Sequence, residues 1–95
     1  MVEKKSRNSR AHLTLHGKVQ NVGLRFFVQR KASACGLRGW VKNSDSCVEI
    51  IFEGDKGKIE DCIKVCRKGP VFSKVEKVDV KWEKPAEKFT RFEVR

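Results

Sequence analysis

The hydrophobic pattern of the chain changes period several times, and the order of these changes constrains the fold more than any other feature. Alternation of apolar and polar residues, typical of half-buried strands, predicts strands at residues 11–16, 37–43, 48–54 and 75–83, with a short last strand at 89–95. A helical spacing of apolar residues predicts helices at 24–35 and 56–68. Gly36 and Gly69-Pro70 are well placed to end these helices.

The order strand–helix–strand–strand–helix–strand, with one extra terminal strand, predicts an α+β fold. We expect a ferredoxin-like split βαβ sandwich, with an antiparallel sheet and two helices on one face. The chain of 95 residues, with 39% hydrophobic residues, is long enough for one such core. The polar and basic residues 1–10 predict a mobile tail before a single domain at 11–95. Because this fold hosts many unrelated functions, the function has to be argued from a site.

The net charge of +10 predicts an anionic partner, which leaves nucleic acid, a membrane surface or a small phosphorylated or carboxylated ligand open. A charged surface that keeps the protein in solution is the alternative explanation. No apolar run has the length needed to span a bilayer, and the first ten residues lack the apolar segment of a secretory signal. We therefore expect a cytoplasmic protein without a membrane partner.

The four cysteines form no C-x-x-C pair. Cys62 and Cys66 lie in helical phase with neighbouring isoleucines, which predicts a buried helix face. Zinc binding requires closer pairing and nearby histidine ligands, so we expect no metal site. A disulfide between Cys35 and Cys47 is left open by the sequence.

Residues 17–27, GKVQNVGLRFF, place two cations and no acid around the expected start of the first helix. Arg25 in the first turn costs a few tenths of a kcal/mol against the helix dipole unless an anion lies between them. Gly17 and Gly23 allow the backbone to curl with converging N–H groups, and Arg25 can add a two-pronged contact. The spacing matches neither G-x-x-x-x-G-K-[ST] nor G-x-G-x-x-G. The segment therefore predicts a phosphate site outside the common nucleotide motifs.

Two separate segments, HGKVQNVGLRFFVQRKA and GLRGWVKN, resemble the two signatures of the acylphosphatase family. The similarity extends over nearly the whole chain beyond the tail, through the segments FEG, GP and F-x-V-R. The resemblance implies hydrolysis of acyl phosphates to a carboxylate and inorganic phosphate, without a metal or organic cofactor. It also implies a small-molecule substrate. No long apolar patch is evident, so a monomer is the default expectation.

The resemblance assigns Arg25 to phosphate binding and Asn43 to holding the attacking water. It implies a phosphate cradle made by the loop residues Lys18, Val19, Gln20, Asn21, Val22, Gly23, Leu24 and Arg25. The motif needs no imidazole, so His12 and His16 are expected to be surface or helix-facing residues and not catalysts. We expect the aromatic residues Phe26, Phe27, Trp40 and Trp82 to serve packing.

Three departures from the family pattern predict reduced but real activity. Asn21 stands where the family usually has glycine, and Leu24 stands where an aromatic residue is usual. The turn 44–47, SDSC, lacks the usual glycine and is one residue shorter. If the loop needs a left-handed backbone at residue 21, Asn tolerates it best, although its side chain enters the cradle.

Two functions from other classes compete with catalysis. An RNA-recognition domain has nearly the same element order, but it needs aromatic residues on the exposed sheet face. The third strand offers either Glu49, Ile51 and Glu53 or a set with the single aromatic Phe52. The second alternative is a non-catalytic acylphosphatase-like domain that senses or relays carbamoyl phosphate within a larger system.

Overall fold

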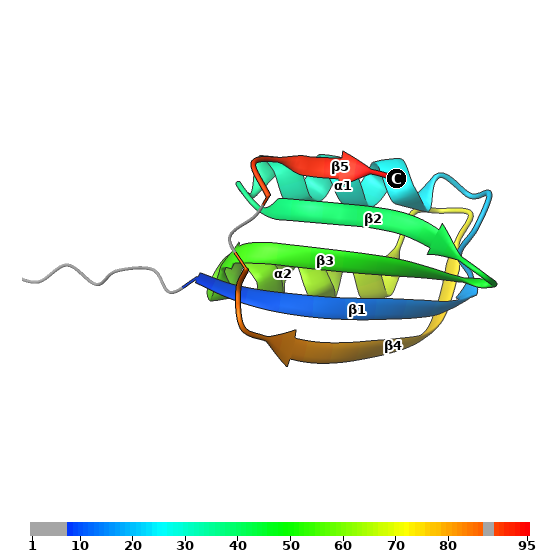
Figure 1. Ribbon diagram of the computed structural model, residues 1–95. Coiled ribbons are helices and arrows are strands. Elements are labelled where there is room, and N and C mark those ends of the chain that lie inside the picture. Colours follow the sequence, from blue (N-terminus) through cyan, green and yellow to red (C-terminus); the bar gives the residue numbers. More distant parts are fainter. Residues whose placement is uncertain (1–7, 87–88) are drawn as a thin grey trace, which may run out of the picture.

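The structure is a computed structural model that describes residues 8–86 and 89–95 (Figure 1). Within these residues the elements follow one another as β1 (Asn8–Lys18), α1 (Leu24–Ala34), β2 (Arg38–Ser44), β3 (Cys47–Asp55), α2 (Lys56–Lys68), β4 (Lys74–Glu83) and β5 (Phe92–Val94). The order confirms the predicted α+β arrangement. Neither described helix is long and apolar enough to cross a membrane.

The strands form one sheet in the order β4-β1-β3-β2-β5, and both helices cover the same face of it (Figure 1). This arrangement is the expected ferredoxin-like split βαβ sandwich. The expectation that the sheet is antiparallel holds for all pairs except the last, because β5 runs parallel to β2. The reason is topological: β4 ends at the end of the sheet where β2 begins (Figure 1), so the returning chain enters β5 in the direction of β2.

The core lies between the sheet and the helices. On β1, Ala11, Leu13 and Leu15 alternate into it, as the pattern predicts. Each helix contributes a stripe at helical spacing, made by Leu24, Val28 and Ala32 of α1 and by Ile59, Cys62, Ile63 and Cys66 of α2. A fully buried aliphatic side chain contributes about 1.5–3 kcal/mol, so these stripes account for the docking of both helices.

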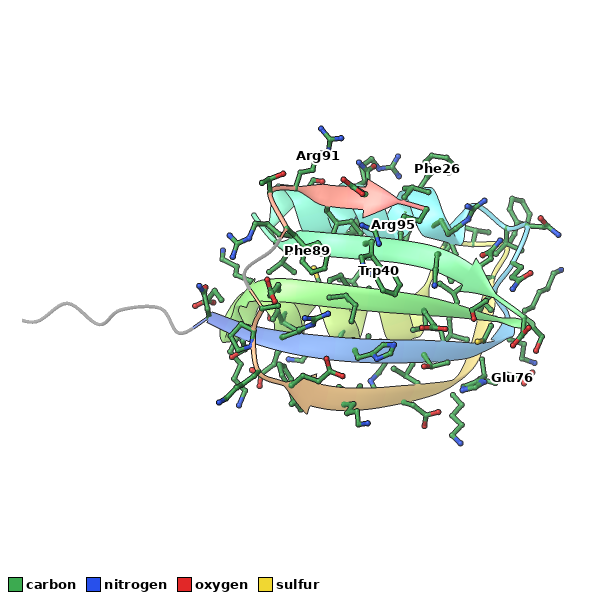
Figure 2. All side chains as sticks on the ribbon, in the orientation of Figure 1. Phe26, Trp40, Glu76, Phe89, Arg91 and Arg95 are labelled. Carbon is green, nitrogen blue, oxygen red and sulfur yellow. The ribbon has the colours of Figure 1, made fainter. Side chains whose placement is uncertain are left out.

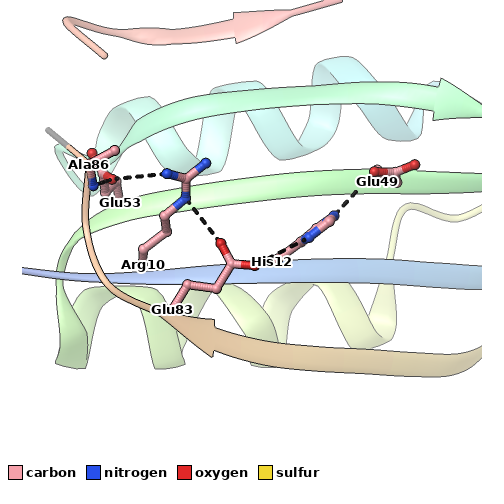
Figure 3. A network of polar contacts seen from close by, with 6 residues as sticks. All are labelled: Arg10, His12, Glu49, Glu53, Glu83 and Ala86. Carbon is pink, nitrogen blue, oxygen red and sulfur yellow. Dashed lines mark hydrogen bonds and ion pairs between the residues drawn. The ribbon is translucent and has the colours of Figure 1, made fainter. Parts of the chain in front are cut away.

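A network of charged groups joins the start of β1 to its two neighbouring strands (Figure 3). The Glu53 carboxylate on β3 is fully buried and accepts a hydrogen bond from the Ala86 N–H at 2.6 Å. The Arg10 guanidinium lies 3.9 Å from Glu53 Oε2 and 3.4 Å from Glu83 Oε1. Because a buried carboxylate requires such partners, this network fixes β1 to the ends of β3 and β4.

The first strand begins three residues before the expected start of the domain at residue 11. The strand starts at Asn8, and residues 8–10 pair in register with β3. The long partner strands and the Arg10 contacts extend the ladder beyond the alternating apolar residues, which were the only local signal. The remaining expected tail, residues 1–7, lies outside the described residues.

All four cysteines are free, so the disulfide considered between Cys35 and Cys47 is not formed. These two residues lie at opposite ends of β2. The Cys35 Sγ instead lies 3.7 Å from the Cys62 Sγ, and the Cys47 thiol donates to the Ser44 carbonyl at 3.1 Å. Sequence spacing alone does not predict the contact between Cys35 and Cys62, because this contact depends on how the two helices pack.

Burial raises the pKa of the Cys66 thiol to about 12, whereas a thiol of the unfolded chain titrates near pH ~8.5. The folded state therefore holds this thiol proton more tightly than the unfolded chain does. The protonated Cys66 thiol contributes fully to the free energy of unfolding below pH ~8.5, and this contribution is lost as the pH rises toward 12. We expect the difference in the free energy of unfolding between the wild type and Cys66→Ala to shrink by about 1–2 kcal/mol between pH 7.5 and 10. Urea unfolding of both proteins at both pH values measures this, and a difference that does not change with pH would contradict it.

Candidate active site

The loop between β1 and α1 is held at both ends by buried side chains. Val19 and Leu24 are each only 1% exposed and belong to the hydrophobic core. Between these anchors the backbone is left-handed at Asn21 (φ 61°) and at the glycine that caps the helix, Gly23 (φ 77°). Turns of this kind let successive backbone N–H groups converge on an anion. Apart from glycine, Asn is among the residues that adopt this left-handed conformation most readily, as expected if the loop needs it at residue 21.

The N-terminus of α1 has backbone donors available. Its first helical hydrogen bond runs from the Phe27 N–H to the Gly23 carbonyl at 3.1 Å. Within the described part of the chain, no side chain caps this end and the first turn holds no acid. The other helix differs, because Asp55 caps α2 by accepting from the Lys58 N–H at 3.1 Å. An uncapped helix N-terminus is a natural position for an anion.

Asn43 reaches the same place from β2. It lies on the same strand face as the buried Val41, which is the face covered by the helices, but it stands beyond the core and is exposed. Asn43 pairs with Val48 inside the β2–β3 ladder, so the strand sets its direction. The short turn therefore leaves the direction of Asn43 unchanged. The chain reverses beyond Asn43, at Asp45, which adopts a left-handed conformation (φ 52°).

The loop, the helix and the strand enclose a pocket of about 90 Å³. Its lining consists of Val19, Asn21, Gly23, Leu24, Arg25, Phe26 and Asn43. The structure thus brings Arg25 and Asn43, which come from two distant segments of sequence, to one site. Of the eight residues expected in the cradle, Lys18, Gln20 and Val22 are outside this lining.

Backbone contacts hold the Arg25 side chain at the edge of the sheet. Its Nη1 donates to the Arg95 carbonyl at 3.0 Å, and the Arg95 N–H donates to the Val41 carbonyl at 2.8 Å. Figure 2 shows Arg95 just beyond the end of β5. A guanidinium has five N–H donors, so one bond to a carbonyl orients Arg25 and leaves other donors for a ligand. Arg95 is thus bonded to β2 at Val41, two residues before Asn43, and its carbonyl orients the Arg25 guanidinium.

Gln20 has a role that the sequence analysis did not identify. Its Nε2 donates to the carbonyls of Asp45 and Cys47, at 2.7 and 2.8 Å. These bonds tie the loop to the β2–β3 turn, next to Asn43. Gln20 is thus a positioning residue, which the sequence could not indicate because its partners lie 25 and 27 residues away.

Phe26 does not pack in the core, so the expectation for this residue is wrong. Its side chain is 61% exposed and lines the pocket. Helical geometry explains the difference, because Phe26 is turned by about 200° from the buried Leu24. The neighbouring Phe27 is half-buried against the core, as expected.

The two histidines lie away from the pocket, on the open face of the sheet. His12 Nε2 is 3.1 Å from Glu49 Oε1, and His16 Nε2 is 3.0 Å from Asp79 Oδ2. Hydrogen bonds from Ser44 and His12 hold the pKa of Glu49 below its usual range, so this carboxylate is ionised at neutral pH. Both histidines are therefore surface partners of carboxylates and do not face the helices. Among the residues that the structure describes, no three His, Cys, Asp or Glu side chains form a group that could hold a metal ion.

The tryptophans take part in surface contacts outside the pocket. Trp40 (Figure 2) is half-buried, with Lys42 Nζ and Arg95 Cζ at 5.1 and 5.4 Å from its ring centroid. Trp82 is 43% exposed and has Lys56 Nζ 5.2 Å from its ring. Cations near aromatic rings stabilise partly exposed surfaces. The expected packing role therefore fits the half-buried Trp40, whereas Trp82 is exposed and does not pack in the core.

Comparison with known proteins agrees with the geometry. The family model for acylphosphatase matches residues 11–94. The chain belongs to the acylphosphatase family. It is 44% identical over 77 residues to an acylphosphatase of Thermococcus kodakarensis, which covers 80% of this chain and 85% of that protein. The crystal structure of acylphosphatase from Bacillus subtilis superposes with a TM-score of 0.88 at 35% identity, covering 92% of this chain and 98% of that one.

The same fold also occurs inside a larger protein. The structure of HypF from Thermococcus kodakarensis matches with a TM-score of 0.80 at 34% identity, over 92% of this chain but only 12% of that chain. The fold of the acylphosphatase family therefore does not by itself separate an independent enzyme from one unit of a larger protein.

The substitution Asn21→Gly tests whether the loop departure limits activity. Glycine adopts φ 61° without strain and removes the side chain that lines the pocket, so we expect turnover of an acyl phosphate to rise by about two- to tenfold. Steady-state kinetics of the wild type, Asn21→Gly and Asn21→Ala measure this. Asn21→Ala is the matched control, because it shortens the side chain but keeps the left-handed strain. Unchanged or lower turnover in Asn21→Gly would show that Asn21 does not obstruct the cradle.

Proposed function

We propose that the pocket between the β1–α1 loop and β2 hydrolyses acyl phosphates, with Arg25 and Asn43 as its catalytic residues. Membership of the acylphosphatase family makes the chain an enzyme that releases a carboxylate and inorganic phosphate from an acyl phosphate. The observation that carries the residue roles is the meeting of Arg25 and Asn43 in one small pocket at an uncapped helix N-terminus.

The phosphoryl group binds at the start of α1. The backbone N–H groups of the loop from Lys18 to Arg25 surround its oxygens, and the Arg25 guanidinium contacts the same oxygens. Phosphoryl transfer requires positioning and stabilisation of charge on the equatorial oxygens, which fixed N–H donors supply without reorganisation. The bound phosphoryl group thereby offsets the unfavourable interaction between Arg25 and the helix dipole.

Asn43 positions the attacking water. Its side-chain carbonyl accepts a hydrogen bond from the water, and its amide donates to the phosphoryl group or to the water oxygen. The water oxygen bonds to phosphorus as the bond to the acyl oxygen breaks, and the carboxylate leaves. The proton of the water passes to a phosphoryl oxygen. The pocket lining contains no Asp, Glu or His, so a mechanism without a protein base fits the residues present.

The open face of the sheet supports a small-molecule substrate rather than RNA. On β3, Glu49 is half-buried and Glu53 fully buried on the open face, while Phe52 is enclosed in the core. A central strand whose open face carries acidic residues and no aromatic ring is a poor platform for stacking bases. We propose a monomeric, cytoplasmic enzyme without a nucleic-acid partner. The four free thiols support this location, because thiols persist in reducing compartments.

Substitution of the two proposed catalytic residues tests the assignment. With a generic aryl acyl phosphate and a chelator present, we expect turnover by the wild type and a loss of about 10²–10³-fold in kcat/KM in Arg25→Ala and in Asn43→Ala. Arg30→Ala is the matched control, because Arg30 is an exposed arginine on the same helix outside the pocket lining. Near wild-type activity in either pocket variant would refute that role. Phosphate binding by calorimetry without any turnover would instead favour a non-catalytic domain.

The net charge of +10 predicts that the surface steers anionic substrates toward the loop. Because salt screens long-range attraction, kcat/KM should fall as the ionic strength rises from 0.01 to 0.5 M (roughly 30 to 4 Å Debye length), while kcat changes little. Kinetics in a neutral salt series measure this, with viscosity and pH held constant. A flat profile of kcat/KM would remove steering from the mechanism.

A further inference from the structure

The pocket is too small to hold a whole acyl phosphate with a large acyl group. Its volume is about 90 Å³, whereas sites for larger organic ligands occupy about 300–1,000 Å³. The phosphoryl group takes the available donors at the start of α1, which leaves the acyl group at the pocket rim. The side chains that line this rim therefore decide which acyl groups are contacted.

Only one of the lining residues offers exposed apolar surface. Val19 and Leu24 are 1% exposed, and Gly23 has no side chain. The others are the polar Asn21, Arg25 and Asn43, together with the aromatic Phe26. Phe26 is 61% exposed, and Figure 2 shows it beside the start of α1 at the margin of the molecule. Its ring takes part in no aromatic or cation–π pair among the described residues, and its exposed part is available to a ligand.

Exposure of a single phenylalanine is common and carries no information by itself. Phe72, for example, is 76% exposed and lies outside the pocket lining. The informative observation is the position of Phe26, which follows Arg25 directly and shares a pocket with both proposed catalytic residues. A ring at this place contacts whatever group projects from a bound phosphate.

We propose that Phe26 is a specificity-determining residue that binds the acyl group, so that the enzyme favours acyl phosphates with a flat, apolar acyl group. This inference rests on the proposed function, since it assumes that the phosphoryl group binds at Arg25. An offset or edge-to-face aromatic pair contributes on the order of a two- to tenfold preference in binding. The contact is made equally in the ground and transition states, so it acts mainly on KM.

The test compares benzoyl phosphate with acetyl phosphate in the wild type, Phe26→Ala, Phe26→Tyr and Phe72→Ala. The quantity measured is the ratio of the two kcat/KM values, because the ratio between variants cancels the different intrinsic reactivity of the two substrates. We expect this ratio to fall by about two- to tenfold in Phe26→Ala, mainly through a higher KM for benzoyl phosphate. Phe26→Tyr should restore the wild-type ratio, and the matched surface variant Phe72→Ala should keep it.

The outcomes separate the two proposals. An unchanged ratio in Phe26→Ala, with both substrates still hydrolysed, overturns the role of Phe26 and leaves the proposed function standing. Equal losses for both substrates also overturn it, because they indicate a general effect on the loop. Absence of turnover of both substrates by the wild type refutes the proposed function itself, and with it the inference.

Discussion

The site depends on two buried side chains that fix the ends of a six-residue loop. Val19 and Leu24 insert into the core between sheet and helices, and the chain must reverse between them within a short distance. A left-handed backbone at Asn21 and Gly23 achieves this reversal. The loop is therefore shaped by the hydrophobic core and not by the ligand. Donors that the fold itself positions are what the proposed electrostatic catalysis requires.

The charges at the site follow from the same constraint. Arg25 occupies the first turn of α1 because Leu24 must face the core, and this places a cation where the helix dipole is unfavourable. The Arg95 carbonyl offsets part of this cost by accepting from the guanidinium. That carbonyl belongs to the end of β5, whose parallel pairing with β2 brings it next to Asn43. The last strand thus contributes Phe92 to the core and also orients the Arg25 side chain, which we propose binds the phosphate.

Much of the fold follows from the sequence, because periodicity reports directly which residues are buried. Both helices and the order of the strands are predictable in this way. The direction of β5 is not, since it depends on the end of the sheet at which β4 finishes. For the site, Arg25 carries a local physical signal at a helix start, whereas Asn43 alone reads as a turn residue and depends on the family resemblance. The exposure of Phe26 was predictable from its phase relative to Leu24, which the double aromatic FF obscured.

Gln20 marks the limit of local reasoning and also explains how the departures in the loop can be tolerated. Its amide donates to two carbonyls of the β2–β3 turn and so links the proposed phosphate loop to the hairpin that carries Asn43. Displacement of a reacting group by about 1 Å costs roughly 10²-fold in rate, so the relative position of loop and strand matters more than the identity of each turn residue. A shorter hairpin or an asparagine in the loop therefore alters the shape of the pocket without separating its two halves. The proposed chemistry needs Arg25 and Asn43 in a fixed relative position, and the buried loop ends, the Arg95 carbonyl and the Gln20 hydrogen bonds all act on the segments that carry them.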